Sequence, residues 1–157
     1  MTRWWRVGLA LLGLGLLAGV AGCAAGPRGP RPVELAPGVY MVPGQPGAAD
    51  ENNLGRIGNS GFIVGPDGVL AVDTGTSFVH GQALLEAIAA VTDKPVKLAL
   101  VTHVRPEFLF GAGAFQARGI PVAMHERSAT LMASRCETCL KTLRQTAGEA
   151  AKVRSGL

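Results

Sequence analysis

Two short apolar runs joined by a tight turn constrain the fold of this chain more than any other feature. The first run is Gly61–Val64 and the second is Val69–Val72. Between them stands Gly65-Pro66-Asp67-Gly68, a sequence typical of turns. The pattern predicts a β-hairpin whose second strand leads into Asp73-Thr74-Gly75.

The residues around the hairpin alternate between extended and helical patterns. Leu84, Leu85, Ile88 and Val91 are spaced as on one face of a helix, which predicts a helix over residues 78–91. Further helices are expected over 107–118 and 126–148, and further strands over 39–42, 96–102 and 121–124. Residues 43–58 are expected to form a loop.

The first 22 residues differ in composition from the rest of the chain. Arg3 and Arg6 precede residues 7–22, which carry no charge. This segment is shorter than the roughly 20 residues that a membrane-spanning helix needs. The arrangement is typical of an export signal. We therefore expect a signal peptide over 1–22, a flexible Gly- and Pro-rich tether over 23–32, and one domain over 33–157.

The leader ends in Val20-Ala21-Gly22-Cys23, which resembles the lipobox of bacterial lipoproteins. The resemblance implies that Cys23 becomes the acylated first residue of the mature protein and anchors it to a membrane. Ala24 follows, which by analogy with lipoprotein sorting favours the outer membrane, with the domain on the periplasmic side. An ordinary signal peptide and an uncleaved anchor with an incidental cysteine are the alternatives.

Three segments of the domain resemble the amino-terminal half of the metallo-β-lactamase superfamily. They are Asn59–Val64, Gly68–Gly75 and Val101-Thr102-His103, with Gly111 following. The resemblance covers about residues 33–127. It implies an α+β fold, namely half of an αββα sandwich with a mixed sheet, flanking helices and one apolar sheet face left open. It also implies a Zn²⁺ site at His103, because the family binds zinc at the carboxyl ends of strands.

The zinc-binding loop of this chain departs from the family motif His-X-His-X-Asp-His. It reads His103-Val104-Arg105-Pro106-Glu107-Phe108, so Arg105 and Phe108 stand where the family has histidines. A fixed cation repels a dication, and a catalytic zinc normally has three protein ligands. Only His103 and Glu107 are candidate ligands, and we expect a defective site or no metal. The resemblance implies that Asp73 lies close to the metal loop and helps to order it, but we favour a turn carboxylate that caps backbone amides after its strand. Glu107 is a candidate general base as well as a candidate ligand, but we favour a first-turn carboxylate at a helix start.

The remaining histidines and cysteines lie outside this loop. His80 and His125 are expected to be ordinary surface or helix-end residues. Cys136 and Cys139 are expected to form a disulfide in an oxidising compartment, with a redox-active pair or free thiols as alternatives. The segment 136–140 is also similar to periplasmic members of the family linked with quinoprotein dehydrogenase systems.

Two functional hypotheses from different classes follow from these residues. In the first, the chain is a divergent, truncated metallohydrolase relative with a defective site of its own. In the second, it is a membrane-tethered binding subunit in which Arg105 holds an anion. A fragmentary reading frame without a selected function is a third possibility. The expected partners are the membrane, through Cys23, and a protein or second copy on the open sheet face; a net charge of +4 without a basic cluster gives no support for nucleic acid.

Overall fold

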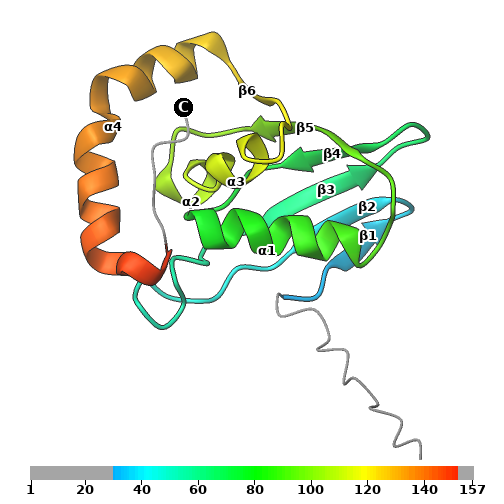
Figure 1. Ribbon diagram of the computed structural model, residues 1–157, viewed down its shortest axis with the longest axis horizontal. Helices are drawn as coiled ribbons and strands as arrows, with labels where there is room; N and C mark the ends of the chain where they lie inside the picture. The colour runs from blue at the N-terminus through cyan, green and yellow to red at the C-terminus, as the bar shows by residue number, and fades with distance from the viewer. Residues whose placement is uncertain (1–29, 152–157) are drawn as a thin grey trace, which may run out of the picture.

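Six strands in one sheet, with helices added after β4, make up this computed structural model (Figure 1). The structure describes residues 30–151, and for Cys136 it describes only the backbone. The predicted signal peptide and Cys23 therefore lie outside the described residues. The elements are β1 (Val33–Ala36), β2 (Val39–Val42), β3 (Ser60–Val64), β4 (Val69–Val72), α1 (Phe78–Ala89), β5 (Val96–Val101), α2 (Pro106–Leu109), α3 (Ala112–Gln116), β6 (Val122–Met124), α4 (Glu126–Ala147) and the 3-10 helix η1 (Glu149–Ala151).

The sheet is mixed, and its strands lie in the order of the sequence. Strands β1 to β4 are antiparallel neighbours, whereas β4, β5 and β6 are parallel. The predicted hairpin is β3–β4, with Val64 opposite Val69 and the turn closed by the Gly65 N–H donating to the Gly68 carbonyl at 2.9 Å. The predicted α+β class with a mixed sheet and flanking helices is thereby confirmed.

One face of the sheet forms the main core with α1 and α3, which pack against each other in Figure 1. Phe62 and Ala71 from the sheet contribute to it, as do Leu84 and Ile88 from α1 and Phe115 from α3. Helix α1 begins after Ser77, whose side chain accepts a hydrogen bond from the His80 N–H at 3.2 Å. Such an N-cap satisfies one of the free amides at a helix start.

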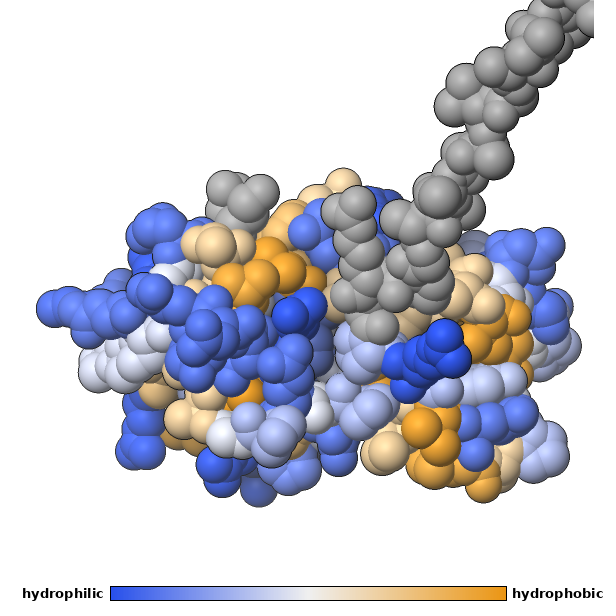
Figure 2. All heavy atoms as spheres, turned by 90° about the horizontal axis from the view of Figure 1, so that it is seen from below, coloured by the Kyte–Doolittle hydropathy of each residue, from blue (hydrophilic) through white to orange (hydrophobic). Residues whose placement is uncertain are grey.

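Helix α4 lies past the end of the sheet and alongside α2 (Figure 1). Its apolar residues Met132 and Leu143 join Leu109 and Phe110 in a second, smaller cluster. Within residues 30–151, no helix is long and apolar enough to cross a membrane. In an edge view, hydrophobic surface occurs in patches separated by hydrophilic residues (Figure 2).

Two local expectations were wrong or incomplete. The helix expected over 107–118 is two short helices, α2 and α3, separated at Phe110 and Gly111. Gly111 packs so closely on the loop after β4 that a Cβ there would overlap the Thr74 carbonyl oxygen. This tertiary contact interrupts the helix. Strand β1 was not expected, and it forms by pairing with β2 at the edge of the sheet.

Candidate functional site

The loops that follow β4 and β5 meet at one edge of the sheet, because these strands are parallel neighbours. Asp73 follows β4, and Thr102 and His103 follow β5. The Asp73 N–H donates to the Leu100 carbonyl at 2.8 Å, which continues the ladder by one residue. The carboxyl ends of parallel strands are a usual place for binding sites in sheets of this kind.

A chain of hydrogen bonds joins the two loops. One Asp73 carboxylate oxygen accepts from the Thr102 N–H at 2.8 Å and from the Thr102 hydroxyl at 2.9 Å. The same hydroxyl lies 2.9 Å from Nδ1 of His103. Asp73 has a φ of 59°, in the left-handed region that Asp tolerates better than most residues. Asp73 therefore holds a backbone amide of the neighbouring loop, as its capping interpretation expects.

Arg105 and Phe108, which stand where the family has histidines, contact the two candidate ligands in the loop after β5. His103 is exposed, and its ring lies 5.6 Å from the ring of Phe108, at a tilt of 51°. Arg105 Nε lies 3.6 Å from Oε2 of Glu107, which is in the first turn of α2. That oxygen is shut off from solvent and makes no hydrogen bond. The Glu107 carboxylate therefore forms an ion pair with Arg105 and not a hydrogen bond.

The donors of this loop do not fit the family's zinc site. Among residues 30–151, no group of three or more His, Cys, Asp and Glu side chains is placed to hold a metal ion. Of the two candidate ligands, Glu107 is paired with a cation, and Thr102 contacts only Nδ1 of His103. The loop therefore offers at most the Nε2 atom of one histidine as a ligand that is not already paired with a cation. A catalytic zinc needs three protein ligands and an open position.

A set of buried hydroxyls beneath the loop was missed by the sequence reasoning. The Thr74 hydroxyl lies 3.0 Å from both the Phe108 and the Leu109 carbonyls. The hydroxyls of Thr76 and Ser77 donate to carbonyls of the loop before β3, at 3.0 and 2.8 Å. These side chains lock three loops together. Ser77 directly before an apolar helical pattern is the one sequence signal that could have indicated part of this set.

His80 is also part of this buried region. It lies in the first turn of α1, as a helix-end residue was expected to, but it is not on the surface. It is only 1% exposed, and its Nδ1 accepts from the Thr76 N–H at 3.1 Å. Its Nε2 is buried without a hydrogen bond. Burial lowers the pKa of His80 to about 4, while the Gly55 backbone acts in the opposite direction. His125, by contrast, is exposed and caps α4, with Nδ1 accepting from the Arg127 N–H.

The two cysteines of the described residues lie on α4. Cys139 is half-buried and packs against the second cluster. The side chain of Cys136 is outside the described side chains, so the disulfide between them stays a prediction. The acylation of Cys23 lies outside the described residues altogether.

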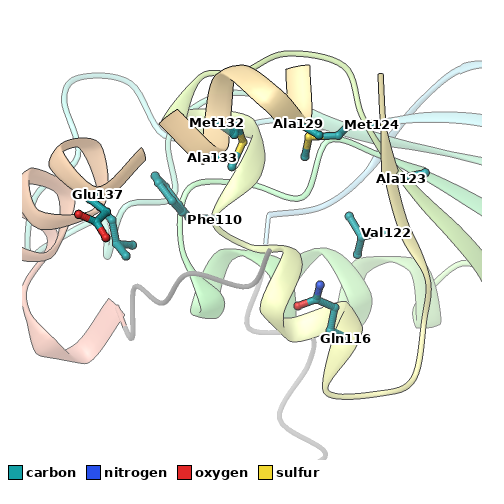
Figure 3. Close-up of a pocket in the computed structure, with 10 residues that line it drawn as sticks. Phe110, Gln116, Val122, Ala123, Met124, Ala129, Met132, Ala133 and Glu137 are labelled. Carbon is teal, nitrogen blue, oxygen red and sulfur yellow. The ribbon is translucent and has the colours of Figure 1, made fainter. Parts of the chain in front are cut away.

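A pocket of about 760 Å³ opens between β6, α3 and α4 (Figure 3). Figure 3 shows Met124 and Met132 close together, with Gln116 and Glu137 toward different ends. Its lining residues are Phe110, Gln116, Val122, Ala123, Met124, Ala129, Met132, Ala133, Glu137 and Leu140. None of the residues of the His103 loop lines it.

Solved metallo-β-lactamases have a similar fold. The enzyme from Erythrobacter litoralis shares 25% identity with a TM-score of 0.54, over 66% of this chain and 44% of that chain. The enzyme from Pontibacter korlensis shares 21% identity with a TM-score of 0.57, over 68% of this chain and 48% of that chain. The present chain therefore spans less than half the length of these structures.

Sequence comparison leads to the same family. A linear primary-alkylsulfatase from Pseudomonas sp. (strain ATCC 19151) is 36% identical over 54 residues, which are 34% of this chain and 10% of that protein. The profile of the metallo-β-lactamase superfamily matches residues 54–152. Since this match covers more than half of the sequence, the chain belongs to the metallo-β-lactamase superfamily and forms part of its fold.

Proposed function

We propose that this chain is a divergent metallohydrolase relative whose own site does not support zinc-dependent hydrolysis. The observation that carries the proposal is the ion pair between Arg105 and Glu107, 3.6 Å apart. The cation in a family histidine position engages the carboxylate in the family aspartate position. A zinc ion there would have to displace Arg105 and would still lack a third ligand from the loop.

A hydrolysis assay tests this proposal. The substrates are a chromogenic β-lactam and an activated thioester, each with and without added zinc. The proposal expects wild-type rates equal to those of His103→Ala and of the control His125→Ala, because no metal-dependent step depends on His103. Zinc-dependent turnover by the wild type that disappears only in His103→Ala would overturn it.

A binding role for the same loop is the second candidate, and the exposure of Arg105 favours it. Its side chain is 67% exposed although Nε faces Glu107. A guanidinium offers five donors, so the remaining ones are suited to an oxyanion from solution. The relative named as an alkylsulfatase suggests a sulfate group as the probe.

A titration with inorganic sulfate, followed by NMR of isotope-labelled protein, distinguishes specific anion binding at Arg105 from an exposed arginine without a binding role. The proposal expects saturable shifts at Arg105 and His103 that are lost in Arg105→Gln. The same substitution at Arg118, another exposed arginine, serves as the control and should leave the titration unchanged. Shifts that do not saturate, or that persist in Arg105→Gln, would contradict the binding role.

The cellular setting is also part of the proposal. We place the chain as an exported lipoprotein, acylated at Cys23 and held on the periplasmic side of the outer membrane. Its support is the lipobox-like Val20-Ala21-Gly22-Cys23, and the similarity of residues 136–140 favours the quinoprotein-associated group. Labelling of cells with a clickable fatty acid should mark the wild type and Cys139→Ser, but not Cys23→Ser. Equal labelling of Cys23→Ser would contradict acylation at this residue.

A further inference from the structure

Helices cover only one of the two faces of the sheet among the described residues. Phe62, Val69, Ala71, Ala99 and Val101 on one face are each at most 3% exposed, in the clusters formed with the helices. The opposite face has no such cover among the described residues, since none of its side chains is buried. The open apolar face expected from the sequence is therefore present in the described part of the fold.

The strand register aligns this open face into two rows. One row crosses all six strands. The other crosses β2 to β5, and Ala36 of β1 pairs with its first residue beyond an irregularity in β1. We call the ten residues the bare face: Val33, Met41, Gly61, Val72, Leu100 and Ala123 in the first row, and Val39, Ile63, Leu70 and Leu98 in the second. All ten are apolar and carry no charge. Val33, Ile63 and Leu100 are 47%, 42% and 36% exposed.

The size of the bare face indicates what kind of partner can cover it. Six strands about 4.8 Å apart are about 29 Å wide, and strands of three to six residues at about 3.3 Å per residue are about 10–20 Å long. A single helix, about 10 Å in diameter, would cover only a part of that width. Soluble monomers rarely expose apolar patches larger than a few hundred Å². A partner that covers the bare face is therefore a layer about as wide as the sheet, either several helices, as on the core face, or a second sheet.

A second copy of this chain supplies such a layer. Its bare face has the same width, the same residue types and no charge that would repel its own image. Two sheets pack face to face about 10 Å apart with strands rotated by about 30°, and identical patches meet naturally about a two-fold axis. We propose that two copies dimerise through the bare face, with the α1–α3 layers on the outside. This inference goes beyond the proposed function, because none of the ten residues belongs to the His103 loop.

Site-specific photo-crosslinking of the full chain in cells tests the dimer. A photoreactive phenylalanine analogue is placed at Ile63 in one variant and at Leu100 in a second, so that failure of one to fold does not decide the result. Val91, 37% exposed and outside the bare face, is the matched control position. Two copies with different tags are co-expressed, and folding is checked by resistance to protease.

The proposal expects crosslinks between the two tagged copies from Ile63 and Leu100 but not from Val91. Adding Leu70→Glu should abolish these crosslinks, whereas Val91→Glu should leave them. Crosslinks from folded bare-face variants to a different protein alone, or none at all, would overturn the proposal. Neither result depends on metal or anion binding at the His103 loop, so this inference and the proposed function can fail separately.

Discussion

Asp73 is the single residue on which the geometry of the candidate site most depends. Its carboxylate holds the Thr102 amide and hydroxyl, and its φ of 59° suits few side chains. Asp73→Ala removes a charged acceptor and leaves a left-handed alanine, so the free energy of unfolding should fall by about 2–3 kcal/mol. Urea denaturation followed by circular dichroism measures this loss.

Two control variants sharpen the Asp73 prediction. Asp73→Asn keeps a side chain tolerant of the left-handed region and one acceptor, so it should lose clearly less stability than Asp73→Ala. Asp67→Ala, in the exposed hairpin turn, should change the free energy of unfolding by less than about 0.5 kcal/mol. If Asp73→Ala were as stable as the wild type, the hydrogen bonds to Thr102 would not hold the loop.

His80 should make the stability of the fold sensitive to acid. Its pKa is lowered from 6.5 to about 4 in the folded chain, because burial disfavours the charged ring. Between these two values the unfolded chain binds a proton that the folded chain does not. The free energy of unfolding should therefore fall as the pH is lowered from 6.5 to 4, by about 3 kcal/mol at most, and the effect should level off below pH 4.

Denaturation at several pH values checks the His80 prediction. His80→Gln keeps an acceptor for the Thr76 N–H and should flatten the dependence between pH 6.5 and 4. His125→Gln, at the exposed cap of α4, should keep the wild-type slope. An unchanged slope in His80→Gln would show that another group controls the acid response.

For single residues, the sequence predicted the position in a strand or helix better than the contacts and burial of the side chain. The placement of His103 after a strand and of Glu107 in a first helical turn followed from local patterns. The pairing of Asp73 with Thr102 depends on two strands becoming neighbours, which no local pattern contains. The burial of His80 depends in the same way on loops that are distant in sequence, so its place near a helix end could be predicted but its burial could not.

At the scale of elements, Gly111 fixes where the segment after His103 changes direction. Its N–H donates to the Gly75 carbonyl at 2.8 Å, and a side chain there would overlap the Thr74 carbonyl. Gly111→Ala should therefore lower the free energy of unfolding by about 2 kcal/mol or more, despite the better helix propensity of alanine. Chemical denaturation measures the loss. Gly65→Ala, where the added atom meets only ordinary contacts, is the control; equal losses in both variants would contradict this account.

The elements that sequence patterns predicted well are those that local chemistry determines. The β3–β4 hairpin has its turn residues between its two strands, and α1 and α4 have long periodic patterns. The interrupted helix and the edge strand were not predictable in this way. Gly111 breaks the helix through a tertiary contact, and Val33–Ala36 becomes a strand only because β2 pairs with it.

At the scale of the whole molecule, residues 30–151 form one sheet with helices on one face, and the chain covers under half the length of the solved relatives named above. The family resemblance predicted this arrangement and the open face, because the order of hairpin, helix and strand is carried by many residues. What covers the open face was not readable from the sequence. The crosslinking experiment at Ile63 and Leu100 addresses that question.

The most direct test of the central claim is the zinc content of the folded chain. Protein dialysed against a low concentration of zinc and then against buffer is analysed for metal per chain, beside His103→Ala. We predict no stoichiometric zinc in either sample, since Arg105 engages Glu107 and His103 has no further ligand from its loop. Close to one zinc per wild-type chain, lost in His103→Ala, would contradict the account and show that a metal centre forms around His103.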